Sequence, residues 1–154
     1  MEALEELSDS EILEGEKAAI MAEPLLLVER KYLTIKTKSG ELKKLELNSV
    51  QRRLLRKIKE IMGRNKPVRL WVLKARQTGI STVGMAICYA FTSQREAINA
   101  LVVADDIDGA NYLFGMQKLF QEQLLEHLKP QIKHSNEKKL EFEHIHSQVL
   151  IDTS

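Results

Sequence analysis

The chain has 154 residues, of which 44% are hydrophobic and 29% are charged, a composition that fits one globular domain with a core of its own. No apolar run approaches the roughly 18 residues of a membrane-spanning helix. The acidic N-terminus is unlike a secretory signal, which begins with positive charge. A single cysteine, Cys88, rules out a disulfide within the chain.

The net charge of +1 hides a strong asymmetry along the chain. Residues 1–23 carry eight acids and one base, whereas residues 52–76 carry ten bases and one acid. The basic block suggests an anionic partner such as nucleic acid or nucleotide phosphate. A solvated helix face is the alternative explanation of the same block.

The N-terminal third is predicted to form a helix and a hairpin. Ser8 and Glu11 have the spacing of a capping box, which predicts a first helix over about 9–22 that Pro24 ends. Apolar residues alternate on both sides of a Ser-Gly turn, so residues 32–47 are predicted to form a β-hairpin.

A basic amphipathic helix is predicted next, over about 49–62. Asn48 is its candidate N-cap, and Gly63 ends it. The apolar residues have helical spacing and leave the bases mostly on the other face; they are Leu54, Leu55, Ile58, Ile61 and Met62.

The middle of the chain is predicted to be a strand, a tight turn and a helix. The apolar run Val68–Leu73 is typical of a central strand that is buried on both sides, with Trp71 in the core. A helix over about 81–93 follows the turn. Cys88 within it is expected to be an inert core residue.

The C-terminal part completes an α/β pattern. Residues 100–104 are predicted to be a second buried strand, and a long helix follows, capped by Asp106 or Asp108. Residues 139–152 are predicted to form a final hairpin. Two right-handed crossovers then predict a parallel sheet with helices on both faces. Ligands of such sheets bind at the carboxyl ends of the strands, an edge that 74–81 and 105–108 would share.

The segment between the first central strand and its helix has the layout of a phosphate-binding loop. It consists of Lys74-Ala75-Arg76-Gln77-Thr78-Gly79-Ile80-Ser81-Thr82. Such a loop needs converging backbone N–H groups, a cation that reaches the β- and γ-phosphates, and a hydroxyl for Mg²⁺. Gly79 supplies backbone freedom, and Ser81 stands at the hydroxyl position with Thr82 behind it. The usual G-x-x-x-x-G-K-[ST] pattern is broken at Lys74, in place of the first Gly, and at Ile80, in place of the Lys.

Two points stay open from the residues alone. Either Lys74 or Arg76 can supply the missing cation, because one can fold over the phosphates and the other can grip their oxygens in a bidentate manner. In the alternative interpretation Ser81 is an ordinary N-cap, and the segment does no more than start a helix.

The same nine residues resemble the deviant Walker A motif of the large terminase subunit of tailed bacteriophages. In many members of that family the lysine stands at the front of the loop, and an Arg-Gln-x-Gly-x-Ser core follows. The surrounding segments are similar too: 47–51 to the adenine-reading Gln motif, 100–114 to the second strand and its helix, and 149–154 to the strand that leads into the next motif. The resemblance covers about 47–154.

The resemblance implies a P-loop NTPase-like core of the RecA/ASCE type, preceded by an N-terminal helix and a β-hairpin. Residues 1–24 would be an acidic N-terminal segment, and residues 25–154 part of an ATPase domain. The family uses ATP and Mg²⁺ to drive double-stranded DNA into a procapsid in the host cytoplasm. The implied partners are double-stranded DNA, a portal protein, a small terminase subunit and further copies in a homo-oligomeric ring, with no membrane.

The resemblance also assigns roles to residues. Lys74 would contact the β- and γ-phosphates, Ser81 would hold Mg²⁺, and Arg76 would be a phosphate-sensing or catalytic arginine. Gln51 would bind the adenine. The other ATP-binding residues would be Ala75, Gln77, Thr78, Gly79, Ile80 and Thr82.

The sequence departs from the family in one respect. It contains no apolar strand that ends in Asp-Glu, the Walker B pair, because residues 100–106 directly follow the loop helix and end in Asp-Asp. The chain stops about where Walker B is expected, without a nuclease domain. We therefore expect an N-terminal part of the ATPase that binds nucleotide weakly and does not turn it over. The alternatives are a non-catalytic DNA- or protein-binding module that uses the basic helix 49–64, and part of a helicase-like ATPase.

Overall fold

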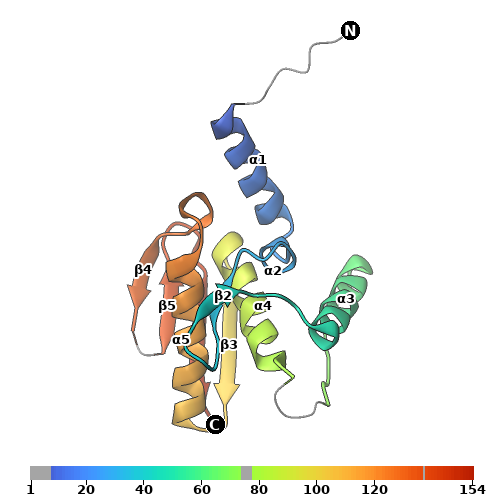
Figure 1. Cartoon of the computed structure of the whole chain (residues 1–154), viewed down its shortest axis with the longest axis vertical. Helices are drawn as coiled ribbons and strands as arrows, with labels where there is room; N and C mark the ends of the chain where they lie inside the picture. Colours follow the sequence, from blue (N-terminus) through green and yellow to red (C-terminus); the bar gives the residue numbers. More distant parts are fainter. Residues whose placement is uncertain (1–7, 74–77, 137) are drawn as a thin grey trace.

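The computed structural model describes residues 8–73, 78–136 and 138–154, and its architecture is α/β (Figure 1). The elements are α1 Asp9–Ala22, α2 Leu26–Glu29, β1 Thr34–Lys36, β2 Leu42–Lys44, α3 Ser49–Gly63, α4 Ile80–Gln94, β3 Asn99–Ala104, α5 Ile107–Gln123, the 3₁₀ helix η1 Glu126–Leu128, β4 Ile132–Ser135, β5 Lys139–Phe142 and β6 Gln148–Thr153. Among the described helices, none has the length and apolar character that crossing a bilayer requires.

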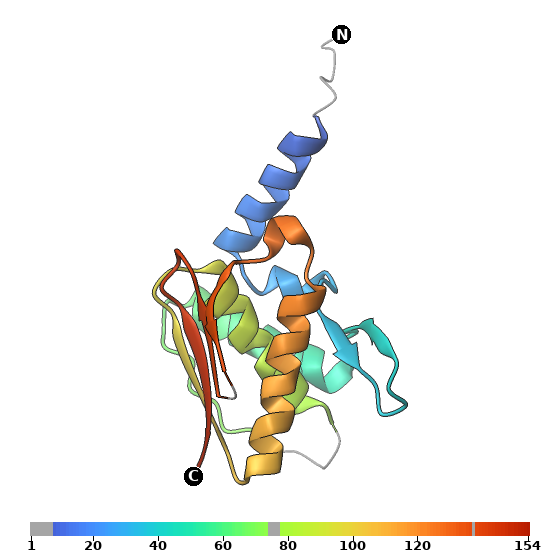
Figure 2. The same ribbon diagram turned by 90° about the vertical axis from the view of Figure 1, so that its left-hand side faces the viewer.

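Helix α1 projects from the rest of the molecule (Figures 1 and 2). It starts where predicted, because the Ser8 N–H donates to Glu11 Oε2 at 2.8 Å in a capping box. Its C-terminal half is held by the buried Ile20 and by Glu16, which hydrogen-bonds the Tyr32 hydroxyl and the ring of His127. These two partners lower the pKa of the Glu16 carboxyl below its ordinary value, the tyrosine contributing more than the histidine. The short helix α2 was not predicted.

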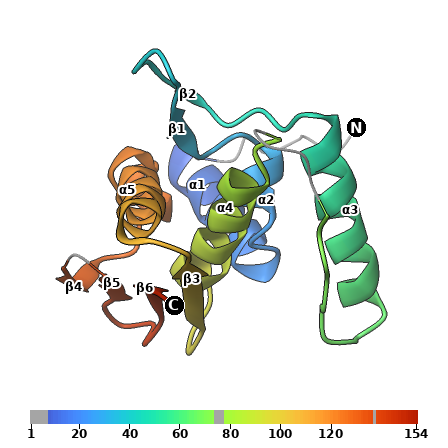
Figure 3. The same ribbon diagram turned by 90° about the horizontal axis from the view of Figure 1, so that it is seen from below.

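The predicted hairpin is present as the antiparallel pair β1–β2, and β1 packs against α5. Helix α3 follows the hairpin and lies on the far side of α4 from α5 (Figure 3). Its bounds match the prediction to within one residue, and Gln51 and Leu55 are buried on its inner face.

The main sheet has four strands in the order β3-β6-β5-β4. Strands β3 and β6 are parallel, whereas β5 pairs antiparallel with both β6 and β4. The prediction of a purely parallel sheet was therefore wrong. The predicted final hairpin explains why, since strands joined by a tight turn can pair only in the antiparallel sense.

One face of this sheet is covered by α4 and α5 (Figure 2). Tyr89 from α4 lies at the centre of the core, with its ring centroid 5.7 Å from that of Phe120 and 6.1 Å from that of Phe142. On the opposite face Leu101 and Val103 of β3 are 64% and 58% exposed. Two predictions were thus wrong: the described helices do not cover both faces, and β3 is not buried on both sides.

The predicted central strand Val68–Leu73 is not a strand in this structure. All six residues are exposed, and Trp71 and Leu73 are fully exposed, so the placement of Trp71 in the core was wrong. In the sheet order β3 and β4 are the outer strands, and this run occupies the free edge of neither. Among the described strands none pairs with this run, so its apolar composition alone could not place it in a sheet.

Candidate functional site

The ends of two strands and two helices meet at one end of the molecule. The carboxyl ends of β3 and β6 lie there, together with the N-terminal ends of α4 and α5 (Figure 1). The start of α4 and the turn before α5 therefore lie at the same edge of the sheet, as predicted, although the run 68–73 is not the strand on which that prediction relied. Helix N-termini carry partial positive charge and free N–H groups, so this end favours anions.

The front of the predicted loop, Lys74 to Gln77, lies outside the described residues. The predicted contacts of Lys74 and Arg76 with phosphate accordingly stay predictions, as do those of Ala75. The back of the loop, from Thr78 to Thr82, lies within the described residues.

Gly79 fixes the backbone at the point where α4 starts. It is the N-cap residue, with φ of 72° in the left-handed region that favours glycine. A Cβ at this position would lie 2.5 Å from Gln51 Nε2, so a larger residue would also displace a buried side chain. Among the described residues no side chain caps α4. The N–H groups of its first turn are therefore available to an anion.

Asn48 and Gln51 fasten this turn to α3. Within α3 they form a capping box, with the Asn48 N–H donating to Gln51 Oε1 and the Gln51 N–H donating to Asn48 Oδ1, both at 2.9 Å. Their side-chain amide groups also donate to the backbone just before α4. Asn48 Nδ2 donates to the carbonyl of Thr78, 30 residues further along the chain, at 3.1 Å, and Gln51 Nε2 donates to the Gly79 carbonyl at 2.8 Å. These bonds hold two loop carbonyls away from the site. A role for Asn48 in the site was missed, since its N-cap position pointed to α3 alone.

The remaining described loop residues follow in the first turn of α4. Ile80 is half-buried, and Ser81 is exposed, so its hydroxyl is accessible at the position predicted for Mg²⁺. One hydroxyl is a suitable hard oxygen donor but only part of a magnesium ligand set.

A cavity of about 440 Å³ lies beside this turn, between the β1–β2 hairpin and α5. Thr82 lines it from α4, and Tyr112 and Lys118 line it from α5. Its remaining walls are largely apolar, and Lys36 stands on the hairpin side. A flat apolar ring with an attached anion would match both the walls and the two lysines.

The aspartates before α5 act mainly as a helix cap. Asp106 Oδ1 accepts a hydrogen bond from the Gly109 N–H at 2.6 Å, which confirms one of the two predicted caps. Over the described ranges, no group of three or more His, Cys, Asp or Glu side chains is placed to hold a metal ion. Cys88 is half-buried, and burial raises the pKa of its thiol, which agrees with an inert residue.

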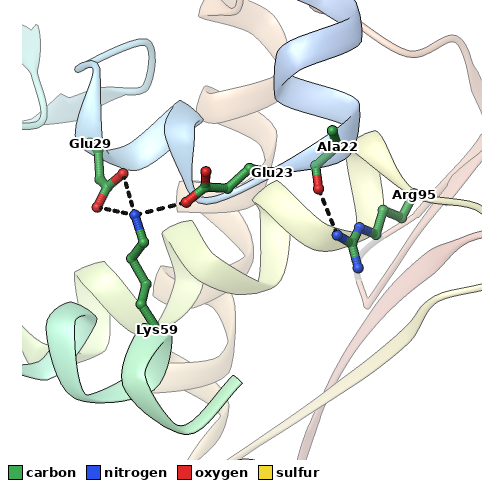
Figure 4. A network of polar contacts seen from close by, with 5 residues as sticks. All are labelled: Ala22, Glu23, Glu29, Lys59 and Arg95. Carbon is green, nitrogen blue, oxygen red and sulfur yellow. Dashed lines mark hydrogen bonds and ion pairs between the residues drawn. The ribbon is translucent and has the colours of Figure 1, made fainter. Parts of the chain in front are cut away.

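The basic helix α3 is partly neutralised by acids. Lys59 Nζ lies 2.7 Å from Glu23 and 2.9 Å from Glu29, and these carboxylates raise its pKa (Figure 4). The same view shows Arg95, directly after α4, donating to the Ala22 carbonyl, so the α1–α2 connection is tied to α3 and to the end of α4. Arg53 and Arg56 are exposed on α3, and within the described part of the chain neither forms an ion pair.

No protein-family model matches the chain, and a comparison with curated proteins finds no match.

Proposed function

We propose that this chain binds the phosphates of ATP at the start of α4, as the N-terminal part of a DNA-packaging motor ATPase of the phage large-terminase type. The observation that carries the proposal is the uncapped first turn of α4 behind Gly79, at the edge where β3 and β6 end. This is the arrangement in which backbone N–H groups and the helix dipole bind phosphate.

The loop residues would supply the positive charge and the metal-binding hydroxyl that the backbone at the start of α4 lacks. Lys74 or Arg76 would bring the positive charge to the β- and γ-phosphates, and the Ser81 hydroxyl would contribute to Mg²⁺ binding. Asn48 and Gln51 support the proposal indirectly, because their hydrogen bonds keep the Thr78 and Gly79 carbonyls turned away from the anion. Double-stranded DNA, a portal protein and a small terminase subunit are the partners that the family resemblance proposes.

Two places can receive the adenine. Gln51 is the reader that the resemblance proposes, although its amide already bonds the Asn48 N–H and the Gly79 carbonyl. The cavity between the hairpin and α5 is the other, with Tyr112 available to stack on the base. Binding of ATP and GTP analogues to Gln51→Ala and Tyr112→Ala variants separates them. Loss of the preference between the two bases in Gln51→Ala would identify Gln51 as the reader. Loss of affinity for both analogues in Tyr112→Ala would identify the cavity, because stacking on an aromatic ring does not distinguish the bases.

The test of phosphate binding is calorimetric titration of the chain with a non-hydrolysable ATP analogue and Mg²⁺. We expect weak binding that Lys74→Ala reduces about tenfold or more, because a hydrogen bond to a charged group contributes about 1.5–3 kcal/mol. Lys66→Ala is the matched control, since it removes the same charge from an exposed position before the loop. If Lys74→Ala and Lys66→Ala bind equally well, the cation is Arg76, and Arg76→Ala should then show the tenfold loss. Affinity equal to that of the control in both Lys74→Ala and Arg76→Ala would contradict the proposal. Multiple turnovers of ATP by the purified chain would contradict our expectation that it binds without hydrolysing.

A second candidate function is binding of DNA by α3 alone. The exposed Arg53 and Arg56, which form no ion pair within the described residues, favour it. Fluorescence anisotropy with a DNA duplex at increasing salt tests it, because contacts with phosphate weaken steeply as salt rises. A loss of DNA affinity in Arg53→Ala/Arg56→Ala, with analogue binding absent from the unmodified chain, would support this function over the first.

A further inference from the structure

Helix α1 carries an apolar stripe that continues past the body of the molecule. Ile20 is buried against the body. Leu13 and Ile12 lie seven and eight residues earlier, which places them on the same side of the helix, two turns further out. They are 43% and 53% exposed, and α1 extends away from every other described element at that point (Figure 2).

The outer half of α1 is also acidic. Asp9, Glu11 and Glu14 are exposed there, and none of them forms an ion pair within the described residues. Lys17 is the one base in the helix. At about 100° per residue Asp9 lies on the same side of α1 as the two apolar side chains, whereas Glu11 and Glu14 lie toward the opposite side. The outer half therefore presents two apolar side chains with the negative charge of Asp9 beside them.

A groove of about 690 Å³, lined by residues of α2 and α3 and of the segments next to them, has the opposite character. We call it the α3 groove; the residues that define it here are Val28, Leu47 and Leu55, which form its apolar floor, and Lys31, Arg52 and Arg56, which carry its positive charge. Its acids are occupied: Glu29 pairs with Lys59, Glu46 with Lys31, and Glu60 with Lys57 and Arg64. Arg56 has no such partner in the described part of the chain, so the free charge of the groove is positive.

We infer that the outer half of α1 from a second copy of this chain docks in the α3 groove. The apolar pair on α1 matches the apolar floor, and Asp9 beside that pair matches the basic side chains of the groove. The contact is between copies because α1 leaves the body away from α3, as Figures 1 and 3 show. Since α1 of one copy meets α3 of the next, the association is head-to-tail.

Two charge reversals test this contact directly. Asp9→Lys changes the docking side of α1, and Arg56→Glu changes the groove. Sedimentation velocity over a range of protein concentrations should show self-association of the unmodified chain, weakened at least tenfold by either reversal, because like charges then face each other. Arg53→Glu is the matched control: it makes the same change on α3 at a position that does not line the groove.

Mixing decides between this contact and a general effect of charge. An equimolar mixture of the Asp9→Lys and Arg56→Glu chains pairs each altered surface with a compatible one, so it should regain association that neither chain has alone. Circular dichroism of each variant checks that the fold is kept. A monomeric unmodified chain at every concentration, equal weakening by Arg53→Glu, or a mixture that stays monomeric would overturn the inference.

Discussion

The two faces of the four-stranded sheet differ in what covers them. On the covered face Val149 and Ile151 of β6 are buried against α4 and α5, together with Leu140 and Phe142 of β5. On the open face Leu101 is in register with Leu150, and Val103 follows two residues further along β3; no described element covers these three side chains. The strands of this sheet therefore contribute side chains to the core from one face only.

The open face is itself divided. Its β3 side is apolar, whereas its β5 side is charged, with Lys138 paired to Asp152 and Glu141 paired to Lys133 and Lys139. A charged sheet face is stable in water, but a cluster of exposed apolar side chains is typical of a contact surface. The apolar half of the open face therefore contributes little to the stability of this chain, whereas the covered face and α4 contribute most.

The largest expected effect comes from neighbouring residues of β6 that point to opposite faces. Ile151 is 1% exposed and Leu150 is 37% exposed. Ile151→Ala should lower the free energy of unfolding by about 2–5 kcal/mol, because it removes buried methyl groups and leaves a cavity. Leu150→Ala should lower it by about 1 kcal/mol or less. Urea denaturation measures both losses in the free energy of unfolding. Equal losses would contradict the difference between the two faces.

A smaller effect is expected where α4, the main cover of the closed face, begins. Gly79→Ala should cost about 1–2 kcal/mol, since the left-handed conformation is unfavourable for alanine. The contact with Gln51 adds to that cost. Gly84→Ala is the control within the same helix: its added methyl meets nothing within 4 Å, so the helix should gain up to about 1 kcal/mol. Thermal unfolding of both variants checks the sign, and a stabilising Gly79→Ala would contradict the described geometry.

The smallest effect concerns the charged half of the open face. Hydrogen bonds with Lys139 and Lys133 lower the pKa of the Glu141 carboxyl from 4.5 to about 2. A depressed pKa stabilises the fold above pH 4.5, and this stabilisation is lost as the pH falls from 4.5 toward 2. Glu141→Gln should therefore be slightly less stable than the unmodified chain at neutral pH, and the difference should vanish in acid or in about 1 M salt. A difference that grows in acid would have the wrong sign.

The sequence predicted local structure well. Ser8, Asn48 and Asp106 start their helices where expected, because an N-cap acts through hydrogen bonds within one turn. Both predicted hairpins are present as well, since a turn and alternating apolar residues suffice to specify them.

Pairings between distant segments were predicted less well. Val68–Leu73 has the composition of a buried strand but lies exposed, although β3 and β4 each keep an edge that no described strand occupies. Composition carries no information about whether a run pairs with such an edge. In the candidate site, Gly79 and Gln51 were singled out for separate reasons. That they touch, and that Asn48 joins them, depends on how α3 packs beside α4 and could not be derived from spacing.

Binding of nucleotide phosphates at the start of α4 can be observed residue by residue through amide hydrogen exchange. With a non-hydrolysable ATP analogue and Mg²⁺ added, the account predicts slower exchange of the Ile80, Ser81 and Thr82 amides, because these N–H groups would donate to phosphate oxygens. The amides in the middle of α3 serve as the internal reference and should not change. Unchanged exchange at the start of α4 under saturating analogue, or slowing confined to α3, would contradict phosphate binding at this position.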